Sequence, residues 1–145
     1  DWLKETRENC LDLIFSVAVE PELPSGLVLV YDYPACQAAL SQIDRNSKGH
    51  SISRRFEVFY NKIEIGNGYF ELLDAVDQNG RFDVDIESRL RCGKPLVRKD
   101  KKFNDAIEAG LPTCEGIPIG VDRLLMGMLG SASIDEVMSF SWPRT

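Results

Sequence analysis

The segment Gly116-Ile-Pro-Ile-Gly-Val-Asp-Arg123 combines residue types that bind phosphate groups. Apolar spacing at residues 121, 124, 125, 128 and 129 predicts an amphipathic helix that begins at Gly120 and ends at Gly130. The N-terminus of a helix offers unpaired N–H groups and the positive end of its dipole. Arg123 falls in the first turn, off the apolar stripe, where its guanidinium group suits a phosphate. A surface arginine paired with an acid fits the same local pattern, so the residues alone leave both interpretations open.

The segment Glu64-Ile-Gly-Asn-Gly-Tyr-Phe-Glu71 is the second candidate, because two carboxylates and Asn67 surround a Gly-x-Gly. In a regular strand, residues seven apart face opposite sides. Glu64 and Glu71 therefore converge only if Gly66 and Gly68 permit a bulge or a bend between them. Convergent carboxylates would bind Mg²⁺ together with nucleotide phosphates, or one of them could bind a substrate ammonium. A charged edge strand with a glycine-softened turn is the alternative.

The elements that must position these residues follow from the apolar pattern. It predicts helices over residues 3–18 (stopped by prolines at 21 and 24), 74–92, 100–109 and 120–129. It predicts strands over residues 27–31 (buried on both faces), 54–60, 63 onwards and 111–119, with a polar loop at 46–53 and a tight turn at Asn61-Lys62. Because strands dominate the middle without regular βαβ units, we expect an α+β fold: a mostly antiparallel sheet flanked by helices.

Composition excludes several classes of protein. The chain of 145 residues is 43% hydrophobic and 28% charged, as expected for one globular domain or part of one. Its net charge of −6 and its short densest basic stretch, residues 98–102, disfavour nucleic-acid binding. It has no run of 18 apolar residues, so no membrane span is expected. Four irregularly spaced cysteines and a single histidine, His50, disfavour a zinc site and suggest reduced thiols in the cytoplasm. Trp2 and Trp142 are expected to anchor packing.

Residues 110–126 resemble motif 3 of the class II aminoacyl-tRNA synthetases, and they are closest to the lysyl branch. Residues 54–74 resemble the strand pair that precedes motif 3 in that branch. Residues 30–40 and 134–144 are similar to a paralogous branch whose members attach β-lysine to elongation factor P. The resemblance spans about residues 10–145 and is dense from residue 54. It implies the fold of the C-terminal part of a class II catalytic domain, covering residues 1–145.

The resemblance also implies an activity: ATP-dependent formation of an aminoacyl-adenylate from lysine or β-lysine, and its transfer to a lysine of elongation factor P rather than to tRNA. Glu64 and Arg123 would be catalytic. ATP would contact Glu64, the Ile65 backbone, Gly120 and Arg123, and Mg²⁺ would lie between Glu64 and Glu71.

The amino acid would meet the remaining implied site residues, Asn67, Glu71 and Gly116. The family further implies a homodimer for the intact protein. Rival interpretations are a lysyl-tRNA synthetase that charges tRNA, a non-catalytic paralogue that binds ATP or an amino acid, and an inactive fragment.

The sequence departs from the family pattern in two respects. No stretch matches motif 1, which builds the family's dimer interface, or motif 2, which clamps the α-phosphate and adenine. We therefore expect the chain to be part of a longer catalytic domain and to bind ATP weakly alone. In addition, Pro118 stands beside the implied amino-acid pocket where the family carries Gly or Ala. Proline is larger and has no N–H, which bears on the choice of substrate.

Overall fold

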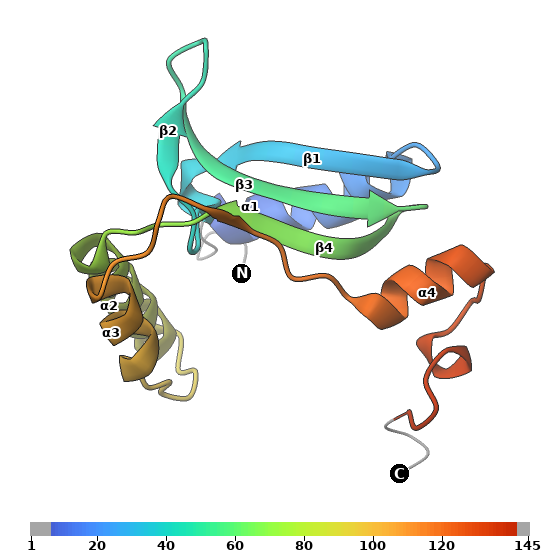
Figure 1. The fold of residues 1–145 in the computed structure, drawn as a ribbon. Coiled ribbons are helices and arrows are strands. Elements are labelled where there is room, and N and C mark those ends of the chain that lie inside the picture. The colour runs from blue at the N-terminus through green and yellow to red at the C-terminus, as the bar shows by residue number, and fades with distance from the viewer. Residues whose placement is uncertain (1–6, 142–145) are drawn as a thin grey trace.

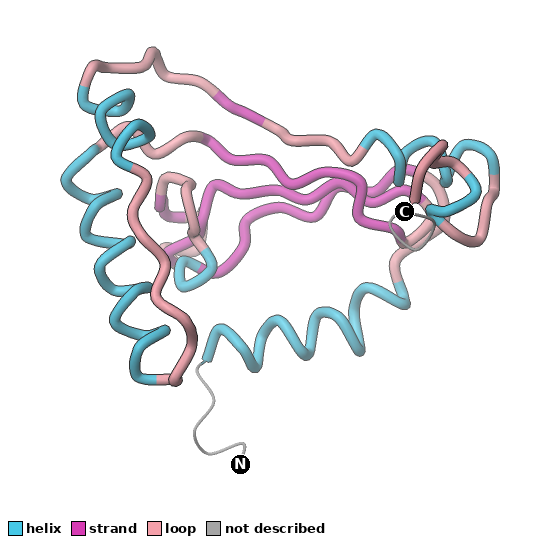
Figure 2. The backbone as a smooth tube through the Cα atoms, turned by 90° about the horizontal axis from the view of Figure 1, so that it is seen from below, coloured by secondary structure: helices cyan, strands magenta, loops and turns pink. Residues whose placement is uncertain are grey.

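A computed structural model of the chain describes residues 7–141. It consists of an antiparallel five-stranded sheet with helices on one face and at both ends, as Figures 1 and 2 show. The strands are β1 (Leu27–Pro34), β2 (Ile43–Arg45), β3 (Ser51–Tyr60), β4 (Ile63–Phe70) and β5 (Glu115–Gly116). The helices are α1 (Arg7–Ile14), α2 (Ala75–Arg91), α3 (Lys101–Glu108) and α4 (Val121–Leu129), with short helical turns at Phe15–Val19, Glu20–Glu22, Ala35–Gln37 and Ile134–Glu136. The predicted α+β class, with a mostly antiparallel sheet, is confirmed.

The strand order is β1-β3-β4-β5, and β2 pairs with the start of β3. The central hairpin joins β3 to β4 through Asn61 and Lys62, whose φ angles are +48° and +68°. Positive φ at both turn residues is the geometry that matches the twist of two antiparallel strands. The tight turn predicted at these two residues is therefore confirmed.

A bulge interrupts β4 next to this hairpin. Phe59 pairs with Glu64 and Val58 pairs with Gly66, so Ile65 is one residue more than β3 can match. Directly paired residues have their side chains on the same face. The extra residue therefore places Glu64 on the face that also carries Asn67, the partner of Glu57.

One face of the sheet is covered and the other is open. The ring of Phe15, in the turn after α1, lies 6.1 Å from the Tyr33 ring and 6.0 Å from the Phe59 ring, measured between centroids. On the opposite face Leu27 is 65% exposed and Tyr31 is 69% exposed. The prediction of a strand here is confirmed, but the prediction that it is buried on both faces is wrong, because the fold covers only one side of β1.

Three element boundaries differ from the predictions. Helical structure continues through Pro21 to Glu22, because proline is accepted in the first turn of the helical segment Glu20–Glu22. The polar loop is shorter than predicted, since residues 43–45 and 51–53 pair as strands. The strand expected over 111–119 is reduced to β5 and a single bridge from Ile119 to Gly66. Pro112 and Pro118 have no N–H to donate to a ladder. The predicted helical residues 3–6, Trp2 and Trp142 lie outside the described residues.

The remaining helices follow their capping residues. The Asp74 side chain accepts hydrogen bonds from the N–H groups of Val76 and Asp77 at the start of α2, and the Asp100 side chain accepts one from the N–H of Phe103 at the start of α3. Gly130, with φ of +66°, ends α4 as predicted. Figures 1 and 2 place α2 and α3 at one end of the sheet and α4 at the other.

The packing of α4 on the hairpin can be tested with two helical glycines. A Cβ at Gly127 would lie 2.5 Å from Tyr60 Cδ1, whereas a Cβ at Gly80 in α2 would meet nothing within 4 Å. We expect G127A to lower the free energy of unfolding by about 1 kcal/mol, since overpacking outweighs the gain in helix propensity. The control G80A should raise it by about 0.5–1 kcal/mol. Urea unfolding measures both, and a stabilising G127A would contradict this packing.

Candidate functional site

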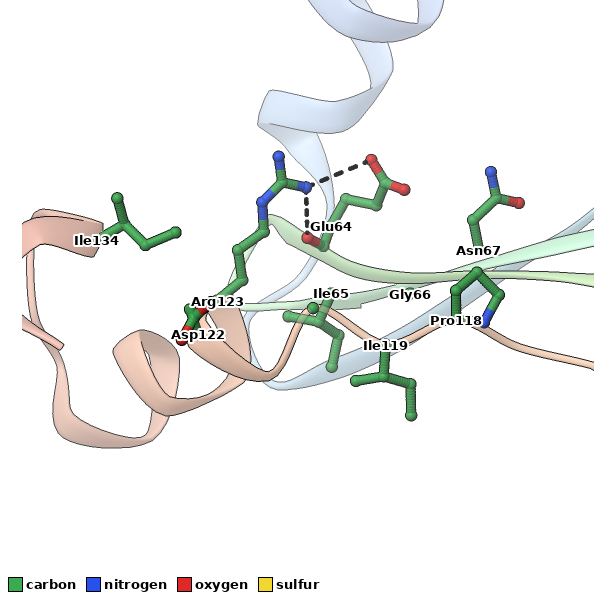
Figure 3. A pocket seen from close by; sticks show the side chains of 10 residues that line it. Glu64, Ile65, Gly66, Asn67, Pro118, Ile119, Asp122, Arg123 and Ile134 are labelled. Atoms are coloured by element: carbon green, nitrogen blue, oxygen red, sulfur yellow. Dashed lines mark hydrogen bonds and ion pairs between the residues drawn. The ribbon is translucent and has the colours of Figure 1, made fainter. Parts of the chain in front are cut away.

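The first end of the candidate site is the contact between Glu64 and Arg123. The Arg123 Nη1 donates a hydrogen bond to the Glu64 backbone carbonyl at 3.1 Å and lies 3.8 Å from Glu64 Oε2. Both side chains line an open pocket of ≈ 450 Å³, together with Asn67, Pro118, Gly120 and neighbouring residues. Figure 3 shows that Glu64, Asn67 and Arg123 point to one side of β4, while Ile65 and Ile119 point to the other.

Backbone hydrogen bonds hold the start of α4 against the bulge of β4. The Gly120 N–H donates to the Ile65 carbonyl at 2.8 Å, and the Asn67 N–H donates to the Pro118 carbonyl at 3.3 Å. Pro118 has no N–H to donate to the ladder, but its carbonyl oxygen still accepts a hydrogen bond from β4. These bonds place Arg123 at the edge of β4, because Arg123 lies in the first turn of α4.

Two glycines at this contact have different roles. A Cβ at Gly66 would lie 3.0 Å from Ile117 Cδ1 and 3.2 Å from the Pro118 carbonyl oxygen, so glycine permits the close approach of the two segments. A Cβ at Gly120 would meet only the Arg123 side chain, at 3.6 Å or more. The packing of the chain itself does not require a glycine at 120, which leaves the space in front of it open to a ligand.

The electrostatics of Glu64 reflect opposing charges. Partial burial raises the pKa of the Glu64 carboxyl group above its ordinary value, and the nearby charge of Glu57 raises it further. The positive charges of Arg123 and Arg55 act in the other direction and lower this pKa. A carboxylate that is crowded by another carboxylate gains from any further cation in the pocket.

Arg55, Glu57 and Tyr33 are site residues that the sequence analysis missed. They lie on the same face as Glu64 and Asn67, and they form a largely buried network in which the Tyr33 hydroxyl donates to Glu57 Oε2 at 2.6 Å. The alternation of Arg55, Glu57 and Phe59 along β3 was a signal for one face of the strand. Only the bulge in β4 reveals that this face is the one Glu64 belongs to.

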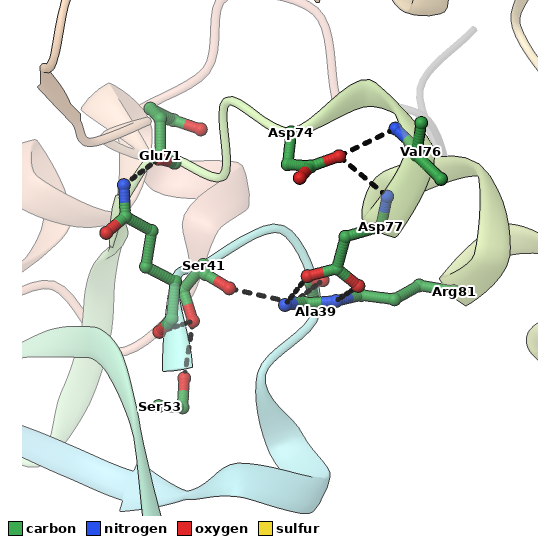
Figure 4. Close-up of polar contacts among 9 residues, drawn as sticks. Ala39, Ser41, Ser53, Glu71, Asp74, Val76, Asp77 and Arg81 are labelled. Carbon is green, nitrogen blue, oxygen red and sulfur yellow. Dashed lines mark hydrogen bonds and ion pairs between the residues drawn. The ribbon is translucent and has the colours of Figure 1, made fainter. Parts of the chain in front are cut away.

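The other end of the candidate site is formed by Glu71 and Gly116. A Cβ at Gly116 would lie 2.6 Å from Glu71 Oε1, so the absence of a side chain makes room for this carboxylate. Burial raises the pKa of the Glu71 carboxyl group. The Gln42 side chain donates to the Glu71 backbone carbonyl at 3.1 Å. Figure 4 shows this contact beside the Arg81 side chain, which donates to the Ser41 carbonyl at 2.7 Å.

The structure brings together five of the residues predicted for the site: Glu64, Ile65, Asn67, Gly120 and Arg123. Glu71 and Gly116 lie further along β4. The bulge puts Glu64 and Glu71 on one face, but they remain separated by on the order of 20 Å of strand, at about 3.3 Å per residue. Two carboxylates that bind one Mg²⁺ directly must lie within about 4 Å of each other. Glu64 and Glu71 thus lie at the two ends of one strip, and the sequence-based assignment of one Mg²⁺ to both carboxylates stays a prediction.

Comparison with known proteins identifies the class to which this fold and site belong. Residues 15–144 match the family model of the class II tRNA synthetases (D, K and N). That match covers most of the chain, so the chain belongs to the class II tRNA synthetase family.

Within the family, the chain is similar to ligases that act on elongation factor P. It is 43% identical over 139 residues to the elongation factor P–(R)-β-lysine ligase of Avibacterium paragallinarum. The aligned region covers 95% of this chain and 42% of that protein. The chain is 44% identical over 138 residues to the ligase of the same name from Pasteurella multocida, with 94% and 42% covered. The same name is carried by a Salmonella heidelberg relative, 41% identical over 142 residues, with 97% and 43% covered. The chain thus spans about two fifths of the length of these curated relatives.

None of the helices within residues 7–141 combines the length and apolarity needed to cross a bilayer.

The contact between Arg123 and Glu64 predicts a specific change in titration. Replacing Arg123 by Gln removes a positive charge that lowers the pKa of Glu64, so that pKa should rise further. The Glu64 carboxylate would then be lost at a higher pH as the solution is acidified. Glu71 is the internal control, because only burial raises its pKa. Carboxyl ¹³C NMR titration of R123Q measures both, and an unmoved Glu64 or an equal shift of Glu71 would contradict the contact.

Proposed function

We propose that the protein activates lysine or β-lysine with ATP and transfers it to a lysine of elongation factor P. An oxygen of the amino-acid carboxylate bonds to the α-phosphorus of ATP as the bond to pyrophosphate breaks, which gives an aminoacyl-adenylate. The acceptor amine then bonds to the carbonyl carbon, AMP leaves, and the amine gives up a proton. This describes the intact protein, because the chain spans only about two fifths of its relatives.

The observation that supports this proposal most strongly is the pocket between β4 and α4. Its Arg123 guanidinium stands at a helix start beside an uncovered glycine, which suits the phosphates of a nucleotide. The names of the relatives support the amino acid and the acceptor. In this proposal Arg123 and Glu64 are catalytic. Arg123 holds the ATP phosphates against charge that develops during the reaction, and Ile65 and Gly120 form the surface against which the nucleotide lies.

Mg²⁺ fits the donor set at the same end. Carboxylate oxygens are the hard ligands it prefers, and the Glu64 side chain is 39% exposed. Glu57 is the diagonal neighbour of Glu64 on the same face, at a typical Cβ separation of about 7–8 Å, so the two long side chains can converge. We therefore propose Glu64 and Glu57 as the pair that holds the metal, and the pair Glu64 and Glu71 is the alternative. When bound, the ion neutralises the phosphate charge.

The amino acid would lie along the rest of the strip. Asn67 and Pro118 stand in the middle, joined through their backbones. Glu71, in the space left by Gly116, supplies a half-buried carboxylate for a substrate ammonium. The proposed acceptor is elongation factor P rather than tRNA. We further propose that the intact protein is a homodimer and that the reaction takes place in the cytoplasm.

ATP–pyrophosphate exchange by the full-length protein tests the activation step. We expect exchange that depends on lysine or β-lysine, and R123A should lower its rate about 100-fold, as loss of a transition-state donor does. The exposed Lys48 in the β2–β3 loop provides a matched control, K48A, which should retain the rate. No exchange with either amino acid would favour a non-catalytic paralogue. Transfer to tRNA but not to elongation factor P would favour a lysyl-tRNA synthetase.

The metal assignment makes a separate prediction. Calorimetry on the full-length protein measures Mg²⁺ binding in the presence of a non-hydrolysable ATP analogue. We expect E57Q and E64Q each to bind Mg²⁺ on the order of 10- to 100-fold more weakly than the wild type. E71Q should leave Mg²⁺ binding unchanged and weaken amino-acid binding instead. If E71Q weakened Mg²⁺ binding while E57Q did not, the assignment to Glu57 would be wrong.

A further inference from the structure

Arg55 lies at the centre of the strip between its two ends. It is opposite Tyr69 across the β3–β4 ladder and two residues from Glu57, which is opposite Asn67. The Arg55 and Glu57 side chains are only 17% and 10% exposed. The Arg55 Cζ lies 4.7 Å from the centroid of the Tyr33 ring and 5.9 Å from that of the Tyr69 ring. Both rings lie within the range of cation–π attraction, which favours this position of the guanidinium.

Arg55 donates hydrogen bonds to two residues of the strip and, through Nη1, to the Gln37 carbonyl at 3.5 Å. Its Nε donates to Asn67 Oδ1 at 3.1 Å, and its Nη2 donates to Glu57 Oε1. The second Glu57 oxygen accepts from the Tyr33 hydroxyl at 2.6 Å. The planar fork of arginine serves both acceptors at once, whereas a lysine ammonium at this position could not keep the same geometry.

The contact with Arg55 determines which end of Asn67 is available to a ligand. Arginine carries only donors, so the Asn67 carbonyl oxygen, not its NH₂, must face Arg55. Asn67 lines the pocket beside Glu64, and its NH₂ group is therefore the group left for a ligand. Without Arg55, the Asn67 amide could turn over and present an acceptor instead.

We propose that Arg55 is a positioning residue: it fixes the Asn67 amide so that this side chain meets its ligand as a hydrogen-bond donor, and it holds the Glu57 carboxylate beside Glu64. The ligand group opposite Asn67 is then an oxygen acceptor, a carboxylate or a phosphate. The nature of that ligand rests on the proposed function. The fixed orientation of Asn67 does not.

Arg54 provides a matched control one residue away. It points to the opposite face of β3, where its Cζ lies 4.1 Å from the Phe70 ring centroid. Its side chain is 42% exposed, and its ion pair with Asp44 is long, at 4.0 Å. R54K and R54Q therefore remove the same chemical group from the same strand without touching the network around Asn67.

NMR of the side-chain amide of Asn67 in the 145-residue chain tests the proposal without any ligand. The NH₂ signals are assigned by their disappearance in N67D. We expect the wild type and both Arg54 variants to share one chemical-shift position for this pair. In R55K and R55Q the pair should move towards the position of exposed asparagine amides. An Asn67 pair that stays in place in the Arg55 variants, or that moves equally in the Arg54 variants, would overturn the proposal.

R55Q leaves the buried Glu57 carboxylate without its cation and could unfold the chain. R55Q/E57Q removes both charges together and keeps the test available, with the same expected movement of the Asn67 signals. An unmoved Asn67 pair in this folded double variant would overturn the proposal as well.

A double-mutant cycle in the full-length protein links this orientation to function. R55K should lower ATP–pyrophosphate exchange by about 10-fold or more, and adding N67A should lower it little further, because coupled residues are not additive. R54K should keep the wild-type rate. Additive losses from R55K and N67A would contradict a positioning role. If the wild type has no exchange activity but its Asn67 signals depend on Arg55, the proposed reaction fails and the positioning role stands.

Discussion

The N–H of Gly120 bonds to the carbonyl of Ile65 at the point where β4 carries one residue more than β3 can match. This bulge reverses the alternation of side chains along β4. Glu64 therefore lies on the same face as Asn67, and both lie beside the network of Arg55, Glu57 and Tyr33 on β3. The same hydrogen bond fixes where α4 begins, and with it the position of Arg123. A single backbone contact thus brings together a carboxylate from one strand and a guanidinium from a helix almost sixty residues later.

Small residues allow the remaining parts of the site to approach β4. Gly66 admits the segment that contains Pro118, and Gly116 admits the Glu71 carboxylate. The result is a strip with a cationic and carboxylate pair at one end, an oriented amide in the middle and a half-buried carboxylate at the other. Such an arrangement matches an extended ligand that carries phosphates at one end and an ammonium at the other. In the proposed reaction, such a site would act chiefly by positioning and charge neutralisation.

Local signals in the sequence were sufficient for much of this architecture. The turn at Asn61-Lys62, the helix capped by Asp74 and the helix that begins after Gly120 depend on residues within a few positions of each other, and all three were predicted. The two residues of the Glu64–Arg123 contact were also predicted, Arg123 from motif 3 and Glu64 from the strand pair that precedes it, because each segment supplied a pattern of fixed spacing. The family membership itself is confirmed by the match over residues 15–144.

The errors arose where distant segments decide the outcome. The run of apolar residues in β1 predicted burial on both faces, but only one face is covered, and apolar content alone cannot distinguish the two cases. Glu57 was missed because its place beside Glu64 depends on the register between two strands. The assignment of Glu71 to the metal stays a prediction, and the length of strand that separates it from Glu64 can be judged only once the bulge is placed.

The register of the β3–β4 hairpin is therefore the most direct test of the account. Cross-strand nuclear Overhauser effects in the 145-residue chain measure it without ligand or activity. The account predicts contacts from Phe59 to Glu64 and from Val58 to Gly66, with Ile65 passed over. A regular ladder, in which Val58 faces Ile65 and Phe56 faces Asn67, would put Asn67 on the face opposite Glu64 and would contradict the site described here.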